Sequence, residues 1–246
     1  MLIDTHFHLD LHENMRHLID EFSNQDNIGI IAVGTTPKAY EKEVLFCRNA
    51  ASIKVGLGLH PQLIGERIHE LGLVLTFIKK ARFIGEIGLD FNSAYIRSEQ
   101  QQIDCFREIA TACAKEQNKV LSIHAVKSVT TILDELEIAG TVNNCVCILH
   151  WFSGTPSERK RAIDDGMYFS INPRMLKTKS GQETIKAIPK NRLLLETDSP
   201  FTMKFNHVSD LENELNKIIE AISDIRNEND RKIIEDNSEK IWDIRY

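Results

Sequence analysis

The sequence predicts an α/β fold, a TIM-type (β/α)₈ barrel, from three observations. The chain has 246 residues, a length at which α/β barrels commonly form one domain. Short apolar runs alternate along it with longer amphipathic ones. Most of the short runs are continuously apolar, as expected for parallel strands that are covered on both faces.

Eight short segments are the expected strands. They are Leu2–His6, Ile28–Val33, Lys54–Leu59, Phe83–Ile87, Val120–Ile123, Val146–Leu149, Tyr168–Ile171 and Leu193–Glu196. Strand alternating with helix eight times favours a closed parallel barrel, although periodicity alone also allows an open, doubly wound sheet.

Longer segments with helical periodicity lie between the strands. The clearest is Glu99–Glu116, whose expected apolar face consists of Ile103, Phe106, Ile109, Ala110 and Cys113. Others are Lys38–Ala50, Leu71–Lys80, Val129–Ile138 and Pro156–Asp165, and two more amphipathic segments follow Pro200. Since no linker interrupts this pattern, we expect a single domain over residues 1–246.

Composition narrows the class of protein. With 42% hydrophobic and 27% charged residues, the chain is typical of a soluble globular protein. No apolar run approaches the ~20 residues that span a bilayer, and no signal peptide is recognisable, so we expect a cytoplasmic location. The five cysteines are scattered and form no C-x-x-C pair, which indicates neither a disulfide framework nor a zinc ribbon. The net charge of −6 argues against a broad basic surface for duplex DNA, but a nuclease can obtain local positive charge from bound metal ions.

Polar residues that carry chemistry fall at the carboxyl ends of the expected strands. They are His6 and His8 at the end of the first strand, His60 after the third, Glu86 in the fourth, His124 after the fifth, His150 after the sixth and Asp198 after the eighth. Any one of them has an ordinary explanation, such as a hydrogen-bonded loop histidine or a turn aspartate. In a barrel, however, these strand ends meet on the face that holds the active site. Imidazoles and carboxylates gathered there predict a site for Zn²⁺, Mn²⁺ or Mg²⁺.

The same motifs, in this order, resemble the TatD family of metal-dependent deoxyribonucleases. The matching stretches are Ile3–His8, Gly58–Pro61, Gly85–Asp90, Ile123-His124, His150–Gly154 and Glu196–Pro200. Together they span about four-fifths of the chain.

The resemblance implies roles for the residues at these positions. One divalent cation would be held by His6, His8 and Asp198, and a second by His124 and His150, with Glu86 bridging both. Asp198 would orient or deprotonate the attacking water. His60 is a candidate for contacting the substrate phosphate, with a structural His-Pro turn as the alternative. Asp90 is expected to support the loop or a ligand histidine, and Glu196 has no expected catalytic role.

The implied substrate is DNA, in single strands or at ends, and two departures from the family bear on how it is bound. The family usually carries an arginine two residues after the fifth-strand histidine, where this chain has Val126; Lys127 and Arg174 are candidates to replace it. The family's Arg-Asn-x-Pro segment has no counterpart in residues 201–207. Phe7, Trp151 and Phe201 flank the candidate ligands and could stack on a base, although core packing explains them at least as well.

Two alternatives stay open. The same kind of site serves the hydrolysis of small esters, amides or phosphoesters in related barrels, because a fold does not dictate its substrate. TatD-like proteins also occur in bacterial defence cassettes, so the chain could be a subunit that depends on protein partners. The acidic residues Glu212, Glu214 and Glu220 could bind such a partner, although a solvated helix face explains them as well.

Overall fold

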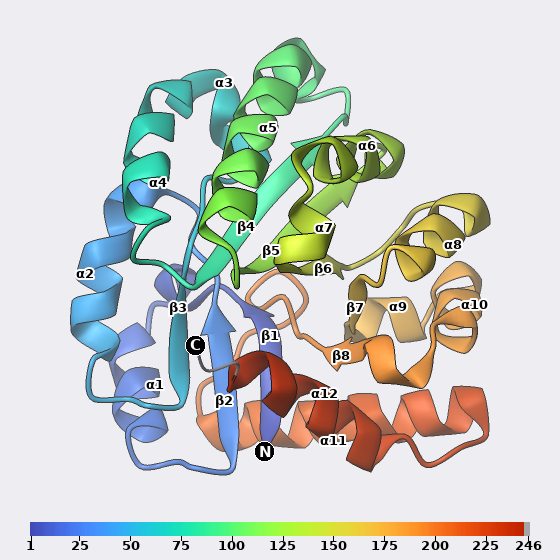
Figure 1. Cartoon of the computed structure of the whole chain (residues 1–246). Coiled ribbons are helices and arrows are strands. Elements are labelled where there is room, and N and C mark those ends of the chain that lie inside the picture. Colours follow the sequence, from blue (N-terminus) through green and yellow to red (C-terminus); the bar gives the residue numbers. More distant parts are fainter. Residues whose placement is uncertain (244–246) are drawn as a thin grey trace. The chain divides into compact units, whose positions relative to one another are not determined.

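The computed structural model describes residues 1–243 and confirms the predicted fold class. Its eight strands form one closed parallel barrel in chain order, β1 to β8. Figure 1 shows how strands and helices alternate along the chain. The strands are β1 (Leu2–Phe7), β2 (Ile28–Ala32), β3 (Ile53–Leu57), β4 (Phe83–Asp90), β5 (Val120–Val126), β6 (Val146–His150), β7 (Tyr168–Ile171) and β8 (Leu193–Leu195). Each predicted strand overlaps one of them.

Helices of both the α and the 3-10 type connect the strands. The α-helices are α1 (Met15–Phe22), α2 (Pro37–Cys47), α3 (Ile64–Arg67), α4 (Leu71–Phe77), α5 (Glu99–Glu116), α6 (Val129–Ala139), α7 (Thr141–Asn144), α8 (Pro156–Asp164), α9 (Pro173–Leu176), α10 (Lys179–Ala187), α11 (Val208–Arg226) and α12 (Arg231–Trp242). Short 3-10 helices lie at Leu9–Leu11, Pro61–Leu63, Ile68–Glu70, Ile96–Ser98 and Lys190–Arg192. The segments that predicted helices are helical, and α5 has the predicted bounds.

The described residues group into two compact units. The first comprises Met1–Ala32, Glu41–Val55 and residues 169–243, and the second comprises Val33–Tyr40 and Gly56–Tyr168. Each unit is described by itself below. A single domain over the whole chain stays a prediction.

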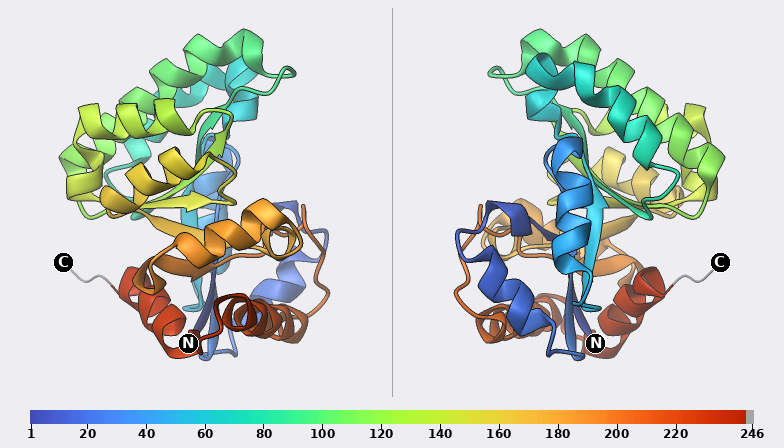
Figure 2. Two further views of the ribbon diagram at one scale, coloured as in Figure 1. Left: turned by 90° about the vertical axis from the view of Figure 1, so that its right-hand side faces the viewer. Right: turned by 90° about the vertical axis from the view of Figure 1, so that its left-hand side faces the viewer.

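The first unit is built around β1. Asp4 of this strand pairs with Ile30 of β2 on one side and with Leu195 of β8 on the other. All of β1 is buried, although Asp4, Thr5 and His6, three of its six residues, are polar. The last helix, α12, contacts β1 and β8, and Figure 2 shows the N-terminus beside it. Gly29 is required for this packing, because a Cβ there would lie 2.8 Å from the ring of Trp242.

The second unit is built around the long strand β4. Its pairing with β5 runs from Phe83↔Val120 to Asp90↔Val126, so both strands extend three residues beyond their predicted ends. Helix α5 packs against β4. Its buried face differs from the predicted one at Ile103, which is only half-buried. Gln102 is fully buried instead, and Cys105 and Ala114 are buried as well. The amide of Gln102 bonds the backbone of Asp90 on both sides, accepting from its N–H (2.7 Å) and donating to its carbonyl (3.2 Å).

Two further findings concern the cysteines and the membrane. All five cysteines are free, and all but Cys145 are buried. Over residues 1–243, no helix combines the length and the apolar character that crossing a bilayer requires.

Candidate metal centre

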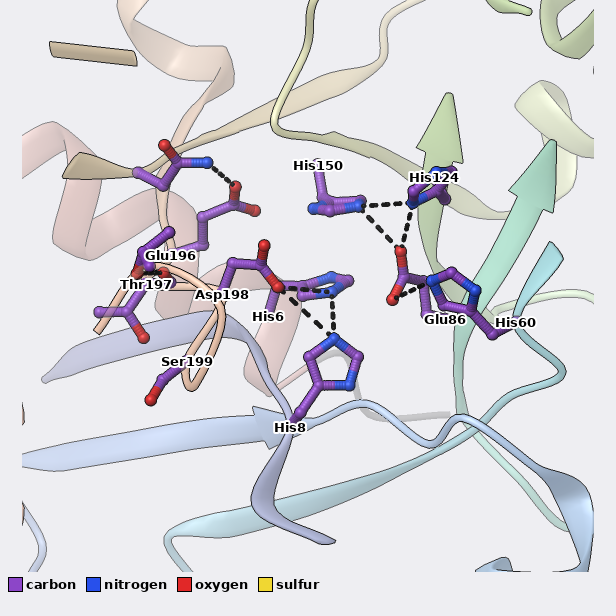
Figure 3. Close-up of polar contacts among 12 residues, drawn as sticks. His6, His8, His60, Glu86, His124, His150, Glu196, Thr197, Asp198 and Ser199 are labelled. Carbon is purple, nitrogen blue, oxygen red and sulfur yellow. Dashed lines mark hydrogen bonds and ion pairs between the residues drawn. The ribbon is translucent and has the colours of Figure 1, made fainter. Parts of the chain in front are cut away.

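The first unit holds a group of donor atoms that we call the β1/β8 cluster, formed by His6, His8 and Asp198. His6 and His8 are two residues apart at the end of β1, and their Nε2 atoms lie 3.3 Å from each other. The Oδ1 atom of Asp198 lies 3.7 Å from Nε2 of His6 and 3.5 Å from Nε2 of His8 (Figure 3). All three residues are at most 4% exposed. These three side chains therefore converge as the sequence predicted.

Backbone hydrogen bonds join the two segments that carry this cluster. The amide of Asp198 donates to the carbonyl of His6 (3.0 Å), and the amide of His8 donates to the carbonyl of Ser199 (2.9 Å). Asp4 adds a side-chain link: it accepts from the amide of His6 (3.0 Å) and from the amide (3.1 Å) and hydroxyl (2.5 Å) of Thr197. Burial raises the pKa of Asp4 to about 8, against the opposing effect of these hydrogen bonds. Asp4 was not among the predicted site residues, although an acid within an apolar strand was the signal that singled out Glu86.

The second unit holds a separate group, the Glu86 cluster, in which one carboxylate contacts three imidazoles. Oε1 of Glu86 lies 2.7 Å from Nδ1 of His124 and 3.0 Å from Nε2 of His150, and Oε2 lies 3.2 Å from Nε2 of His60 (Figure 3). Glu86 is 2% exposed and His150 is 6% exposed. Four strands contribute, since the histidines follow β3 or lie in β5 and β6 while Glu86 lies in β4. The structure thus places His60, a predicted substrate contact, among the candidate ligands.

Asp90 fixes the orientation of the His124 ring. Its Oδ2 lies 3.1 Å from Nε2 of His124 and accepts from the side-chain amide of Gln62 (2.7 Å). Burial alone would lower the pKa of His124, but its hydrogen bonds to Asp90 and Glu86 outweigh burial and raise it. Likewise, burial would raise the pKa of Asp90, but hydrogen bonds from His124, Gln62 and a backbone amide lower it. With Nε2 bound to Asp90, Nδ1 is the atom that His124 presents to the cluster. A carboxylate behind a histidine in this way is typical of metal sites.

Gly88 allows the close approach of β4 and β5 beside His124. Its φ is +140°, and a Cβ at this position would lie 2.0 Å from the carbonyl oxygen of His124. Only glycine tolerates both conditions. The residue therefore sets the distance between the strand of Glu86 and the strand of His124.

The chemistry of both clusters suits divalent cations. The donor atoms of His6, His8 and Asp198 all lie within 4.8 Å of one another, and so do those of His60, Glu86 and His124. Imidazole nitrogens with one carboxylate are the ligands that Zn²⁺ and Mn²⁺ accept, and buried carboxylates are costly without a cation or hydrogen-bond partners. The donors present therefore fit a metal in each cluster.

Other predicted residues have structural roles. Glu196 is fully buried; the Ser170 hydroxyl and the Asn172 amide both donate to its carboxylate. Phe7 is 1% exposed and stacks on His12 with ring centroids 4.8 Å apart, so the idea that it stacks on a base is wrong. Phe201 is different, because it is 56% exposed and its ring meets that of His8 edge-on at 5.1 Å.

A closed parallel barrel with imidazole and carboxylate clusters at the carboxyl ends of its strands defines the class of metal-dependent barrel hydrolases. The comparisons with known proteins give the family. The family described as TatD related DNase matches residues 3–243, and this chain belongs to it. The chain is therefore a metal-dependent hydrolase.

Individual relatives agree with this assignment. The chain is 31% identical to the uncharacterized metal-dependent hydrolase YabD of Bacillus subtilis, over 82% of this chain and 81% of that one. It is 26% identical to deoxyribonuclease TATDN3 of Homo sapiens, over 81% of this chain and 78% of that one. Among solved structures, a TatD family hydrolase from Entamoeba histolytica has the same fold, with a TM-score of 0.79 and 18% identity over 98% of this chain and 97% of that one.

Proposed function

We propose that this chain is a deoxyribonuclease that hydrolyses phosphodiester bonds in DNA with two divalent cations, Mg²⁺, Mn²⁺ or Zn²⁺. The observation that supports this most is that each of two clusters, one buried and one largely buried, combines imidazoles with a single carboxylate. The family to which the chain belongs is described as TatD related DNase, and the human relative is named a deoxyribonuclease.

In this proposal each cluster holds one cation. His6, His8 and Asp198 hold the first, and His124 and His150 hold the second. The role of Glu86 as a ligand shared by both cations rests on the family resemblance. When bound, such a pair of cations lowers the pKa of a bound water and stabilises the attacking and leaving oxygens of a phosphoryl displacement.

Asp198 is the residue proposed to orient the attacking water and accept its proton. The backbone that carries its carboxylate is held by hydrogen bonds on both sides, because the amide of Asp198 donates to His6 and its backbone carbonyl accepts from the amide of Phe201 (2.9 Å). A base with a fixed position can take a proton without reorganising, and such general-base catalysis typically contributes 10²- to 10⁴-fold, roughly 3 to 5 kcal/mol.

His60 is proposed to contact the substrate phosphate. Its Nδ1 accepts from the amide of Gln62 (3.2 Å), so a proton on the ring belongs on Nε2. Nε2 is also the atom that faces the Glu86 cluster, 3.2 Å from Oε2. An N–H there can donate to a phosphate oxygen bound at the cluster.

Phe201 is the proposed contact with a base. It is a large exposed apolar side chain directly against the ring of His8. Unpaired bases stack on exposed aromatic rings, whereas paired bases are occupied by their neighbours in the helix. We therefore propose that single strands or frayed ends are the preferred substrates.

Cleavage of end-labelled DNA tests this function. Purified protein is incubated with single- and double-stranded oligonucleotides and Mg²⁺, Mn²⁺ or Zn²⁺, beside Glu86→Gln and the surface control Glu116→Gln. We expect metal-dependent cleavage by the wild type and the control and none by Glu86→Gln, with single strands cut faster. A wild type that binds metal and hydrolyses small esters or amides but not DNA would refute the proposal and favour a small-molecule hydrolase. Cleavage only in the presence of a second protein would refute it for the isolated chain.

A further inference from the structure

A third group of histidine and carboxylate donors lies in the first unit, on α1 and at the start of α11. It consists of His17, Glu21 and His207, and we call it the α1/α11 cluster. Nε2 of His17 lies 3.1 Å from Oε1 of Glu21, and Nδ1 of His207 lies 2.8 Å from the same oxygen. The two nitrogens are 3.3 Å apart. Its residues are distinct from those of the β1/β8 cluster.

The sequence explains why these side chains converge. His17 and Glu21 are four residues apart on α1, which places them on the same face one helical turn apart. His207 immediately precedes α11, and the two helices are in contact. The second oxygen of Glu21, Oε2, accepts from the amide of Val208 (2.7 Å). That bond anchors the carboxylate and directs Oε1 at the two imidazoles.

The distances have the scale of a coordination shell. Metal–nitrogen and metal–oxygen bonds of ~2.0–2.2 Å place neighbouring donors about 3 Å apart at right angles and about 3.4 Å apart in a tetrahedron. The three observed separations run from 2.8 to 3.3 Å. Each of the three atoms also lies within hydrogen-bond distance of the other two, and hydrogen bonds alone satisfy such a triangle poorly. If both imidazoles donated to Oε1 of Glu21, their two N–H groups would crowd each other, whereas one cation accepts all three lone pairs.

We propose that His17, Glu21 and His207 form a structural Zn²⁺ site that joins α1 to the start of α11. Two imidazoles among three donors select zinc or a similar transition ion over Mg²⁺ and Ca²⁺, which prefer oxygen ligands. The partial exposure of the side chains, 50% for His17, 28% for Glu21 and 56% for His207, leaves room for water as the fourth ligand. Residues 199–207 connect Asp198 to α11 and include Phe201. Because His207 is the last residue of this segment, zinc bound here restrains the segment at its C-terminal end.

Zinc stoichiometry tests the proposal independently of nuclease activity. Tag-free wild type, His17→Ala/His207→Ala and the control His69→Ala are dialysed against Zn²⁺, and bound zinc is counted by mass spectrometry. His69 is also exposed, with 66% of its side chain accessible, and lies outside the cluster. We expect the double variant to hold one zinc fewer per chain than the wild type and the control. Equal zinc content in all three proteins would overturn the proposal.

A single substitution and a stability measurement complete the test. Glu21→Gln keeps the size of the side chain but weakens the ligand. Since residues behind metal ligands already change affinity by about 10- to 100-fold, we expect at least a tenfold weaker zinc affinity at this site. Zinc should also raise the thermal midpoint of the wild type more than that of either variant, while Mg²⁺-dependent activity stays unchanged. An identical zinc-induced rise in all proteins would count against the site.

Discussion

The β1/β8 cluster and the Glu86 cluster have similar donors but different construction. The first takes one imidazole from β1 and one from the residue directly after it. His6 and His8 are two residues apart, and the twofold period of an extended chain directs both to the same side. The second takes one side chain from each of four successive strands or their ends, so the register between strands sets its geometry. The lesson is that a local motif is enough to anticipate the first cluster, whereas the second depends on how neighbouring strands align.

The strongest way to separate the two clusters is to compare their single carboxylates. Glu86→Ala should abolish detectable turnover and lower metal content, because three imidazoles lose their shared partner. The loss of several kcal/mol of charge stabilisation corresponds to a decrease in kcat by a factor of about 10³ or more. Asp198→Asn should retain more metal and still lose about 10²-fold or more in kcat if Asp198 is the general base. Metal analysis and steady-state kinetics measure both; full activity of either variant would refute its assigned role.

The metal affinity of the Glu86 cluster should depend on Asp90, a buried acid that is not one of the candidate ligands. Asp90→Asn should weaken the orientation of His124 and lower metal affinity by about 10- to 100-fold, since outer carboxylates typically have effects of this size. The β1/β8 cluster should keep its own affinity in this variant. Metal titrations of Asp90→Asn and of the surface control Asp104→Asn would show the difference, and two identical titration curves would contradict it.

DNA binding beside the β1/β8 cluster should depend on the exposed side chain of Phe201. If a base stacks there, Phe201→Ala should weaken single-stranded DNA binding by about fivefold or more, because stacking contributes about 1–3 kcal/mol per base. Cleavage of a substrate too short to reach the ring should change little. Phe46→Ala removes another exposed phenylalanine and serves as the control in the same binding assay. Equal affinities for both variants would assign Phe201 no part in binding.

The smallest expected effect concerns the end of β5. Val126→Arg restores the family's arginine at the end of this strand and should tighten DNA binding a few-fold at low salt, with a steeper salt dependence from one more phosphate contact. Val126→Met adds length without charge and should leave binding unchanged. Fluorescence anisotropy at several salt concentrations distinguishes the two. If both variants bind like the wild type, the substrate backbone does not pass this strand end.

The fold could be predicted from the sequence because parallel strands that are covered on both faces have nearly continuous apolar runs. The residues that form the β1/β8 and Glu86 clusters could be singled out because acids and histidines stand out at the ends of such runs. The extension of β4 to Asp90 could not be predicted from the sequence, because it depends on pairing with β5 and on the positive φ of Gly88. The bond between Asp90 and His124 also escaped prediction in detail, since it links residues 34 apart in sequence.

The α1/α11 cluster shows where motif reasoning stops. His17 and Glu21 are recognisable as a helical pair, but His207 joins them only because α11 begins beside α1. No pattern in the sequence connects positions so far apart. The same holds for Asp4, whose bonds to Thr197 appear only once β1 and β8 are paired.

The exchange of hydrogen bonds between His6–His8 and Asp198–Ser199 has a consequence for biosynthesis. A ribosome makes His6 and His8 long before Asp198, so their carboxylate partner emerges only when synthesis has passed β8 and has almost reached α11. All residues of the Glu86 cluster are translated before then. The nascent hydrolase therefore lacks its proposed general base until the segment after its eighth strand has left the ribosome, and any activity it acquires begins only then.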